Sequence, residues 1–242
     1  MNRSQTACPF PRTLFIPEKR LERVCAEALE SVGLMPSDAE PIRIDRFVEK
    51  FFEVDIAYDD LGSRFEEGVM GACRFNRGGE VAEILIDRSL GDDDSKLGLR
   101  RERSTLAHEA GHGLFHGELF AEKLRADEEI KANGLIDTDF QNGVFSEGFA
   151  CRGLGDPIVS RKDWWEVQAN MAMAALLLPR QLLDPFLRDY VKPIKLSYGS
   201  TFTPDLEDAC GGIADAFNVS VTMARFRIEK EFERLQNQPD LF

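Results

Sequence analysis

The chain of 242 residues contains three histidines, and all of them lie in one segment of nine residues, at His108, His112 and His116. His108, Glu109 and His112 form an H-E-x-x-H motif. On a helix, residues four positions apart face the same side, so two imidazoles can share one metal ion with the glutamate beside it. The motif therefore predicts a metal site with His108 and His112 as ligands and Glu109 as the general base of a hydrolytic reaction.

The alternative interpretation is a surface helix that happens to carry three histidines. Apolar residues cover most of its circumference, however, and predict burial on several sides. Gly111 and Gly113 each cost a helix about 1 kcal/mol relative to alanine, and such small residues usually mark close backbone packing. Burying histidine and glutamate together is unfavourable unless they pair or bind a metal, which favours the metal site. The apolar residues are Leu106, Ala107, Ala110, Leu114 and Phe115.

His116 is not expected to bind the same ion. Eight residues of helix rise about 12 Å, whereas a histidine holds a metal roughly 6 Å from its own Cα. The longer metzincin motif would also need glycine at position 115 and histidine at position 118, where the chain has Phe115 and Glu118. We therefore expect His116 to support the ligands or the core.

The third ligand must then be a carboxylate or a cysteine. The best candidate segment is 164–179, an apolar helical run that ends at Pro179. Glu166 and Asn170 lie four residues apart on its single polar face. Glu166 would complete a His₂Glu site with an open position for water, and Asn170 would accept a hydrogen bond from a ligand histidine. The alternative is an ordinary glutamate at a helix N-terminus.

These two helices together resemble the ImmA/IrrE family of metallopeptidases. The similar segments are H-E-A-G-H at 108–112 and E-V-Q-A-N at 166–170, the latter leading into L-L-L-P at 176–179. The resemblance covers roughly residues 40 to 230, and the pair of motifs is more specific than H-E-x-x-H alone. The departures are Ala110, Leu178 and a long acidic insert after His116, and none of them removes a ligand.

The resemblance implies a zincin-like endopeptidase that uses Zn²⁺, with Mn²⁺ as the alternative metal. Its substrate would be a helix-turn-helix repressor, whose cleavage derepresses genes in mobile elements or stress responses. Two alternatives stay open: a less selective housekeeping peptidase, and a non-catalytic module or toxin–antitoxin partner whose metal is structural. The sequence does not identify the group that stabilises the oxyanion. Tyr190, Tyr198 and an arginine are equal candidates for it.

Composition restricts the class of protein and its partners. The net charge of −13 disfavours direct binding of nucleic acid and favours a basic partner. No segment is apolar over the length of a membrane span, and the N-terminus lacks the apolar region of a signal peptide. The cysteines are odd in number and lack C-x-x-C spacing, which predicts reduced thiols and a cytoplasmic protein. They are Cys8, Cys25, Cys73, Cys151 and Cys210.

The pattern along the chain predicts an α+β fold in which a small antiparallel or mixed sheet packs on the H-E-x-x-H helix. We expect a flexible lead-in at 1–20, a metallopeptidase domain at 21–200 and a C-terminal helix pair at 201–242. That pair resembles a helix-turn-helix, but neither helix offers a basic face, so we expect it to pack on the same domain. The predicted helices are 21–32, 44–51, 99–116, 164–178, 204–217 and 220–235, the predicted strands are 54–58, 69–75 and 81–86 with a hairpin turn at 76–79, and 119–160 is expected to be irregular.

The strand at 81–87 raises a question about substrate binding. Peptides commonly pair with an exposed sheet edge beside the metal of such peptidases. If this strand were an edge, a basic segment of a repressor would dock along it, next to Glu83 and Asp87. The equal alternative is an interior strand.

Overall fold

The fold is α+β, with a six-stranded mixed sheet and helices on and around it. The computed structural model describes residues 10, 12–132, 140–141, 144–145, 148–152, 163–190, 194–195, 201–202 and 205–236. Its helices are α1 (Glu18–Ser31), α2 (Ile44–Phe52), α3 (Leu61–Arg64), α4 (Arg88–Gly91), α5 (Lys96–Phe115), α6 (Gly117–Ala132), α7 (Trp164–Leu177), α8 (Arg180–Tyr190), α9 (Leu206–Ala216) and α10 (Val221–Gln236). Its strands are β1 (Ile56–Asp59), β2 (Val69–Phe75), β3 (Val81–Asp87), β4 (Phe140–Gln141), β5 (Val144–Phe145), β6 (Gly148–Arg152), β7 (Ile194–Lys195) and β8 (Thr201–Phe202). None of the helices in this described part has the length and hydropathy that a membrane crossing requires.

The strand order of the main sheet is β1-β3-β2-β6-β5-β4, in which only β1 and β3 are parallel. The predicted hairpin between β2 and β3 is confirmed. The Asn76 side chain accepts hydrogen bonds from the backbone N–H groups of Gly78 and Glu80. Gly79 adopts a φ of 87°, which favours glycine, and lies so close to Gly117 that a Cβ would meet its carbonyl oxygen at 2.3 Å.

Strand β3 is interior, so the proposed docking of substrate along its edge is wrong. It pairs with β1 on one side and β2 on the other, and the side chain of Glu83 forms an ion pair with Arg74 at 2.6 Å. Ile84, Leu85 and Ile86 are all buried. This continuous apolar run shows that both faces of the strand are covered there, whereas a strand with one solvated face alternates.

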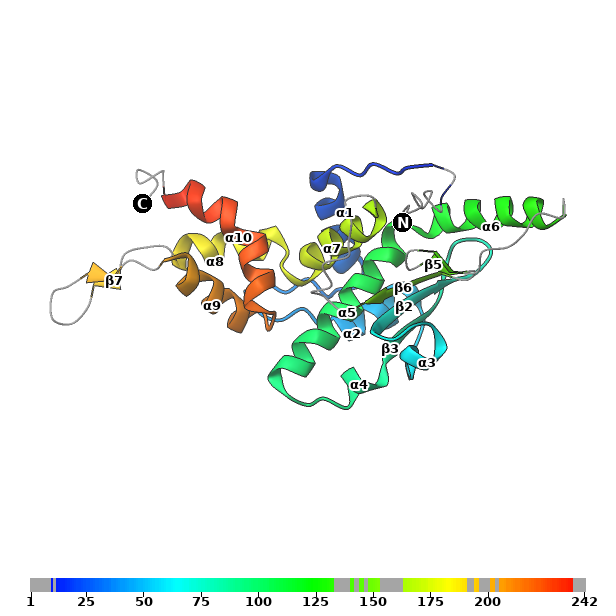
Figure 1. The fold of residues 1–242 in the computed structure, drawn as a ribbon. Coiled ribbons are helices and arrows are strands. Elements are labelled where there is room, and N and C mark those ends of the chain that lie inside the picture. The colour runs from blue at the N-terminus through cyan, green and yellow to red at the C-terminus, as the bar shows by residue number, and fades with distance from the viewer. Residues whose placement is uncertain are drawn as a thin grey trace, which may run out of the picture.

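Helix α5 is the central element, because it packs on β2 and β3 and also on α7 (Figure 1). It begins three residues earlier than predicted, since the Ser95 side chain caps its N-terminus by accepting from the N–H of Gly98. The predicted close packing at Gly111 is confirmed: a Cβ there would lie 2.9 Å from the Ala172 Cβ and 3.0 Å from the Ala169 carbonyl oxygen. The backbones of α5 and α7 therefore approach closely beside the H-E-x-x-H motif.

The segment after α5 differs from the prediction of an irregular stretch at 119–160. Helix α6 begins directly after His116, and β6 joins the main sheet. Leu119, Phe120 and Ala121 are buried, and the Phe120 ring packs against Phe75 with centroids 5.2 Å apart. The acidic residues of α6 conceal this apolar contact in the sequence, and the contact is what holds the helix against the sheet.

Of the lead-in predicted to be flexible at 1–20, the structure describes residue 10 and residues 12–20, and the other positions lie outside the described residues. Helix α1 already begins at Glu18. Phe10 is 6% exposed, and its ring lies against the rings of Phe149, Trp164 and Trp165. Burial of these aromatic rings fixes the segment across the H-E-x-x-H region.

The C-terminal helices α9 and α10 are bound to the rest of the fold by arginines. Arg100 of α5 donates to the carbonyl of Ala214 at 2.7 Å. From α10, the side chain of Arg227 donates to the carbonyl of Leu178 and to Glu22, while Arg225 pairs with Glu207. These arginines form hydrogen bonds and ion pairs within the protein, as expected for a helix pair that packs on the same domain.

Candidate metal centre

Four side chains from three elements converge beside the crossing of α5 and α7. His108 and His112 come from α5, Glu166 from α7 and Cys151 from β6, and one ligand atom of each lies within 4.8 Å of all the others. Among the described residues this is the group of side chains that could hold a metal ion. The helix crossing explains the meeting, because Gly111 lets the face of α5 that carries both histidines lie against Glu166 of α7.

The spacing of the ligand atoms is close to that of tetrahedral coordination, with Glu166 placing Oε2 toward His108 and Cys151 and Oε1 toward His112. The His108 Nε2 lies 3.1 Å from each of the His112 Nε2, the Cys151 Sγ and a Glu166 carboxylate oxygen. The His112 Nε2 lies 3.3 Å from the Sγ and 3.4 Å from a Glu166 oxygen, and the Sγ lies 3.6 Å from the nearer Glu166 oxygen. Typical zinc bonds of about 2.0–2.3 Å separate tetrahedral ligand atoms by about 3.3–3.7 Å. The three separations of 3.1 Å are slightly below this range and the other three are within it, so a zinc-sized ion fits once the side chains move outward by a few tenths of an ångström.

Asn170 fixes the tautomer of His108. Its Oδ1 lies 3.0 Å from the His108 Nδ1, which is the contact expected from the sequence. An amide oxygen only accepts, so the Nδ1 carries the hydrogen and the Nε2 of a neutral His108 has a free lone pair. That lone pair points at the other three ligand atoms, as metal coordination requires.

His116 fixes the tautomer of His112 through a chain of hydrogen bonds. The Gln168 Nε2 donates to the carbonyl of Leu14 at 2.7 Å, so its Oε1 faces the His116 Nε2 at 3.0 Å and accepts from it. The His116 Nδ1 is then the acceptor for the His112 Nδ1–H at 2.9 Å. This leaves the His112 Nε2 lone pair free, and His116 supports a ligand instead of binding the ion.

Burial keeps His116 in the neutral form that this chain needs. Burial, together with the neighbouring His112, lowers the pKa of His116 to about 3. The sequence analysis named His116 as a supporting residue but missed Gln168, two residues after Glu166. Gln168 is 7% exposed, and a buried amide that close to a ligand is the signal that could have identified it.

The electrostatics of the cluster favour a cation at its centre. With these tautomers, the Nε2 lone pairs of His108 and His112 face each other at 3.1 Å, an arrangement that is favourable only with a positive charge between them. Burial acts to raise the pKa of Glu166, but His112 and His108 outweigh it and lower that pKa well below its usual range. The Glu166 carboxylate is thus ionised, as a metal ligand must be.

Glu109 lies beside this cluster as a buried carboxyl group. It is fully buried, and within the described residues neither carboxylate oxygen has a hydrogen-bond partner of normal geometry. Burial, with a smaller contribution from the charge of Glu166, raises the pKa of Glu109 to about 8, although His108 and Cys151 act to lower it. Gly71 of β2 makes the space, because a Cβ there would meet a Glu109 oxygen at 2.6 Å. A buried carboxylate near neutrality is suited to proton transfer.

Cys151 is the cluster member that the sequence did not single out. It is a free cysteine, buried in β6. Burial raises its pKa well above the ordinary value, and the charges of Glu109 and Glu166 add to the rise. In a strand, a lone cysteine resembles any small apolar residue, and its distance along the chain from the histidines matches no metal motif. Its position is evident only once β6 is paired with β2.

The candidates for an oxyanion-stabilising group receive no support from the described residues. Tyr190 stacks on Phe186 with ring centroids 5.8 Å apart, and its ring lies close to Gly212 of α9. It therefore packs between α8 and α9. Tyr198 lies outside the described residues.

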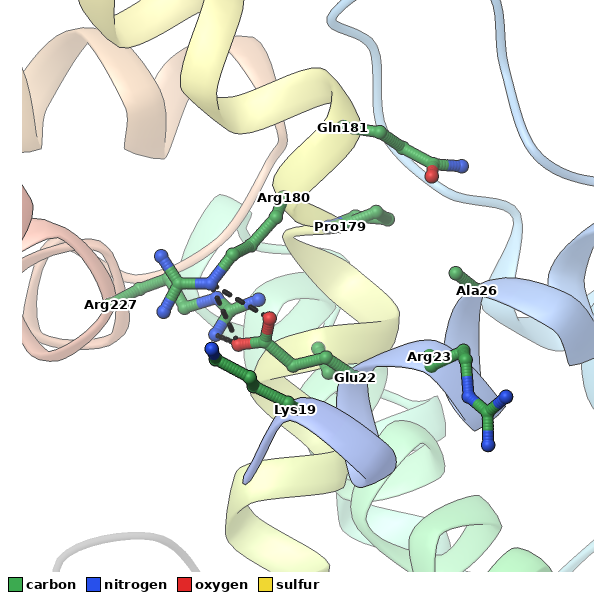
Figure 2. A pocket seen from close by; sticks show the side chains of 9 residues that line it. Lys19, Glu22, Arg23, Ala26, Pro179, Arg180, Gln181 and Arg227 are labelled. Carbon is green, nitrogen blue, oxygen red and sulfur yellow. Dashed lines mark hydrogen bonds and ion pairs between the residues drawn. The ribbon is translucent and has the colours of Figure 1, made fainter. Parts of the chain in front are cut away.

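A separate pocket of about 230 Å³ lies between α1, the junction of α7 with α8, and α10 (Figure 2). Although basic side chains surround it, Arg180 and Arg227 both converge on Glu22. Its contact with α7 at Ala175 is nine residues beyond Glu166, about 13 Å along the helix. It is thus a salt-bridged seam between helices and no part of the metal centre. The lining residues are Lys19, Glu22, Arg23, Ala26, Ala175, Pro179, Arg180, Gln181 and Arg227.

In comparisons with known proteins, the chain matched no family model, no curated protein and no solved structure. The geometry of the metal centre and the motifs in the sequence are therefore what indicates its function.

Proposed function

We propose that this protein is a zinc-dependent endopeptidase with a zincin-like architecture, similar to the ImmA/IrrE family. In this proposal His108, His112 and Glu166 hold the metal, for which Mn²⁺ is the alternative to Zn²⁺. Glu109 is the catalytic base. Asn170 and His116 orient the two histidine ligands by hydrogen bonds to their Nδ1 atoms.

The observation that carries the proposal is the state of Glu109. A buried carboxylate without a partner is costly, and a site that only stabilised the fold would have no use for one. Next to a metal centre, the same carboxylate has a role, since a general base works best when its pKa is near the working pH. In the metal-free protein burial raises the pKa of Glu109 to about 8, and the positive charge of a bound metal would lower it from there.

The chemistry divides between the metal and the protein. When bound, Zn²⁺ would supply Lewis acidity, polarising the scissile carbonyl and making a nearby water more acidic. Glu109 takes a proton from that water as it attacks the carbonyl carbon, and passes the proton to the leaving amine nitrogen. The aromatic and apolar residues around the cluster exclude bulk water, and the Phe149 ring stacks on His112 with centroids 4.2 Å apart.

The substrate in this proposal is a basic helix-turn-helix repressor, cleaved so that its target genes are expressed. The family resemblance supports the class of substrate, and the net charge of −13 supports a basic partner. Docking along β3 is excluded by its two neighbouring strands.

The test uses the purified protein, Zn²⁺ and any helix-turn-helix repressor found to be encoded beside its gene. Glu109→Gln should keep the metal and reduce cleavage by about 10²–10⁴-fold, the usual contribution of a general base. His108→Ala should lose the metal, as measured by elemental analysis. An unfolded basic protein as a second substrate separates a selective peptidase from a housekeeping one. Cleavage by Glu109→Gln at the wild-type rate would contradict the mechanism.

A second candidate function is a non-catalytic module with a structural metal. One specific observation favours it, because Cys151 gives the centre four protein ligands, and structural zinc sites are usually closed in this way. This candidate predicts stoichiometric metal, no cleavage, and unfolding when the metal is removed by a chelator.

A further inference from the structure

Cys151 occupies the side of the centre where a hydrolase needs water. A catalytic zinc site holds three protein ligands and leaves the fourth position open. Here the Cys151 Sγ lies 3.1 Å and 3.3 Å from the Nε2 atoms of His108 and His112. The sulfur is also close enough to Glu109 for that carboxylate to act on its ionisation. It therefore lies between the ligands and the base, where the attacking water would be.

We propose that Cys151 is a displaceable fourth ligand of the metal centre, which closes the site at rest and must leave before hydrolysis can begin. This inference rests on the proposed peptidase function and adds its regulation. A permanently closed centre would explain the four ligands but would leave the buried Glu109 without a purpose. A latent enzyme explains both.

The position of Cys151 in the sheet allows such a displacement. Cys151 pairs with Gly71 of β2, and the register between the two strands shifts next to that pair. On the other side of β6, within the described residues, β5 pairs only with Gly148 and Phe149. Among the described residues, Cys151 thus has a ladder partner only on the β2 side, at an irregular point where the local disruption of the ladder lowers the cost of moving the strand.

The exchange needs no oxidant or reductant. With a metal held by His108, His112 and Glu166, the Cys151 sulfur would release the ion and take up one proton from solvent, and water would fill the space that the sulfur leaves. The closing step is the reverse, since a thiol that binds a metal releases its proton. A movement of β6 would therefore decide whether Cys151 binds the metal or leaves its position open to water.

Cobalt substitution tests the ligand without relying on activity. Co²⁺ added to the metal-free full-length protein should give a thiolate-to-cobalt charge-transfer absorption in the near ultraviolet. Cys151→Ser and Cys151→Ala should abolish that absorption while still binding Co²⁺. Cys210→Ser is the matched control, because Cys210 is a buried cysteine on α9 outside the cluster, and it should keep the absorption. A wild-type protein without the band would overturn the proposal and leave the peptidase function standing.

Cleavage of the repressor, with Zn²⁺ in excess, tests the latency. If the sulfur occupies the position for more than about nine-tenths of the time, removing it should raise the rate by at least about tenfold. Cys151→Ser and Cys151→Ala should both show this increase, and adding Glu109→Gln should abolish it. Equal rates for the wild type and the Cys151 variants would refute the latency. No cleavage by any of them, with the cobalt band present, would instead refute the peptidase function itself and identify a structural site.

Discussion

Replacing His116 by phenylalanine would test the hydrogen-bond chain that runs from Leu14 to His112. The change keeps a planar ring in the aromatic surroundings of Phe149 and Trp164 but removes both ring nitrogens. It leaves two buried groups without partners, the Nδ1–H of His112 and the Oε1 of Gln168. Each such group costs about 1–3 kcal/mol. The free energy of unfolding should thus fall by about 2–6 kcal/mol, before any gain from the more apolar ring.

The larger consequence of the same change concerns the metal. Without an acceptor at Nδ1, His112 is free to place its hydrogen on Nε2, the atom that faces the other ligands. Loss of a supporting partner of this kind typically weakens metal binding about 10–100-fold, which corresponds to about 1.4–2.8 kcal/mol. The affinity should be measured by zinc competition against a chromophoric chelator, and the stability by urea unfolding of the metal-free protein.

His116→Gln is the control for that experiment. Its amide oxygen can accept from His112 and its amide nitrogen can donate to Gln168, so it should recover most of the zinc affinity. If phenylalanine and glutamine weakened zinc binding equally, the loss would come from packing and the tautomer argument would be refuted. Unchanged affinity in both variants would refute it as well.

Two further predictions concern Glu109 and the helix crossing. Because the folded-state pKa of Glu109 is raised from 4.5 to about 8, its contribution to the stability of the metal-free protein is full below pH 4.5 and is lost as the pH rises through 8. The stability of Glu109→Gln relative to wild type should thus increase over that range in urea unfolding and then level off, and a pH-independent difference would contradict the burial argument. Gly111→Ala should destabilise the fold by about 1–3 kcal/mol, because the new methyl group would clash with α7. Gly211→Ala is the control: no atom lies within 4 Å of its Cβ position, so this change should stabilise the fold by up to about 1 kcal/mol. Similar effects on stability at both positions would show that close packing at Gly111 does not limit the stability of the fold.

The elements predicted well from the sequence are those whose residues carry a local signal. The H-E-x-x-H helix has its motif and its glycines, and the β2–β3 hairpin has its Asn76–Gly79 turn. Helix α7 is apolar and ends before Pro179. In each case the chemistry of neighbouring residues decides the local structure, so no knowledge of distant contacts is needed.

The errors come from features that depend on distant contacts. The interior position of β3 follows from its pairing with β1, although the uninterrupted run Ile84–Ile86 was a usable sign. Helix α6 depends on Phe120 meeting Phe75. Cys151 reaches the metal centre only through the pairing of β6 with β2. A single sequence does not reveal which strand lies beside which, so a ligand delivered by strand pairing escapes it.

The concentration of every histidine of the chain in one place has a practical consequence. The three imidazoles form a single buried row, and no other part of the protein contains one. In protein labelled with ¹⁵N only at histidine, each imidazole resonance in a nuclear magnetic resonance spectrum would belong to the row. The protein thus carries its own site-specific probe, provided that it is prepared without a histidine tag.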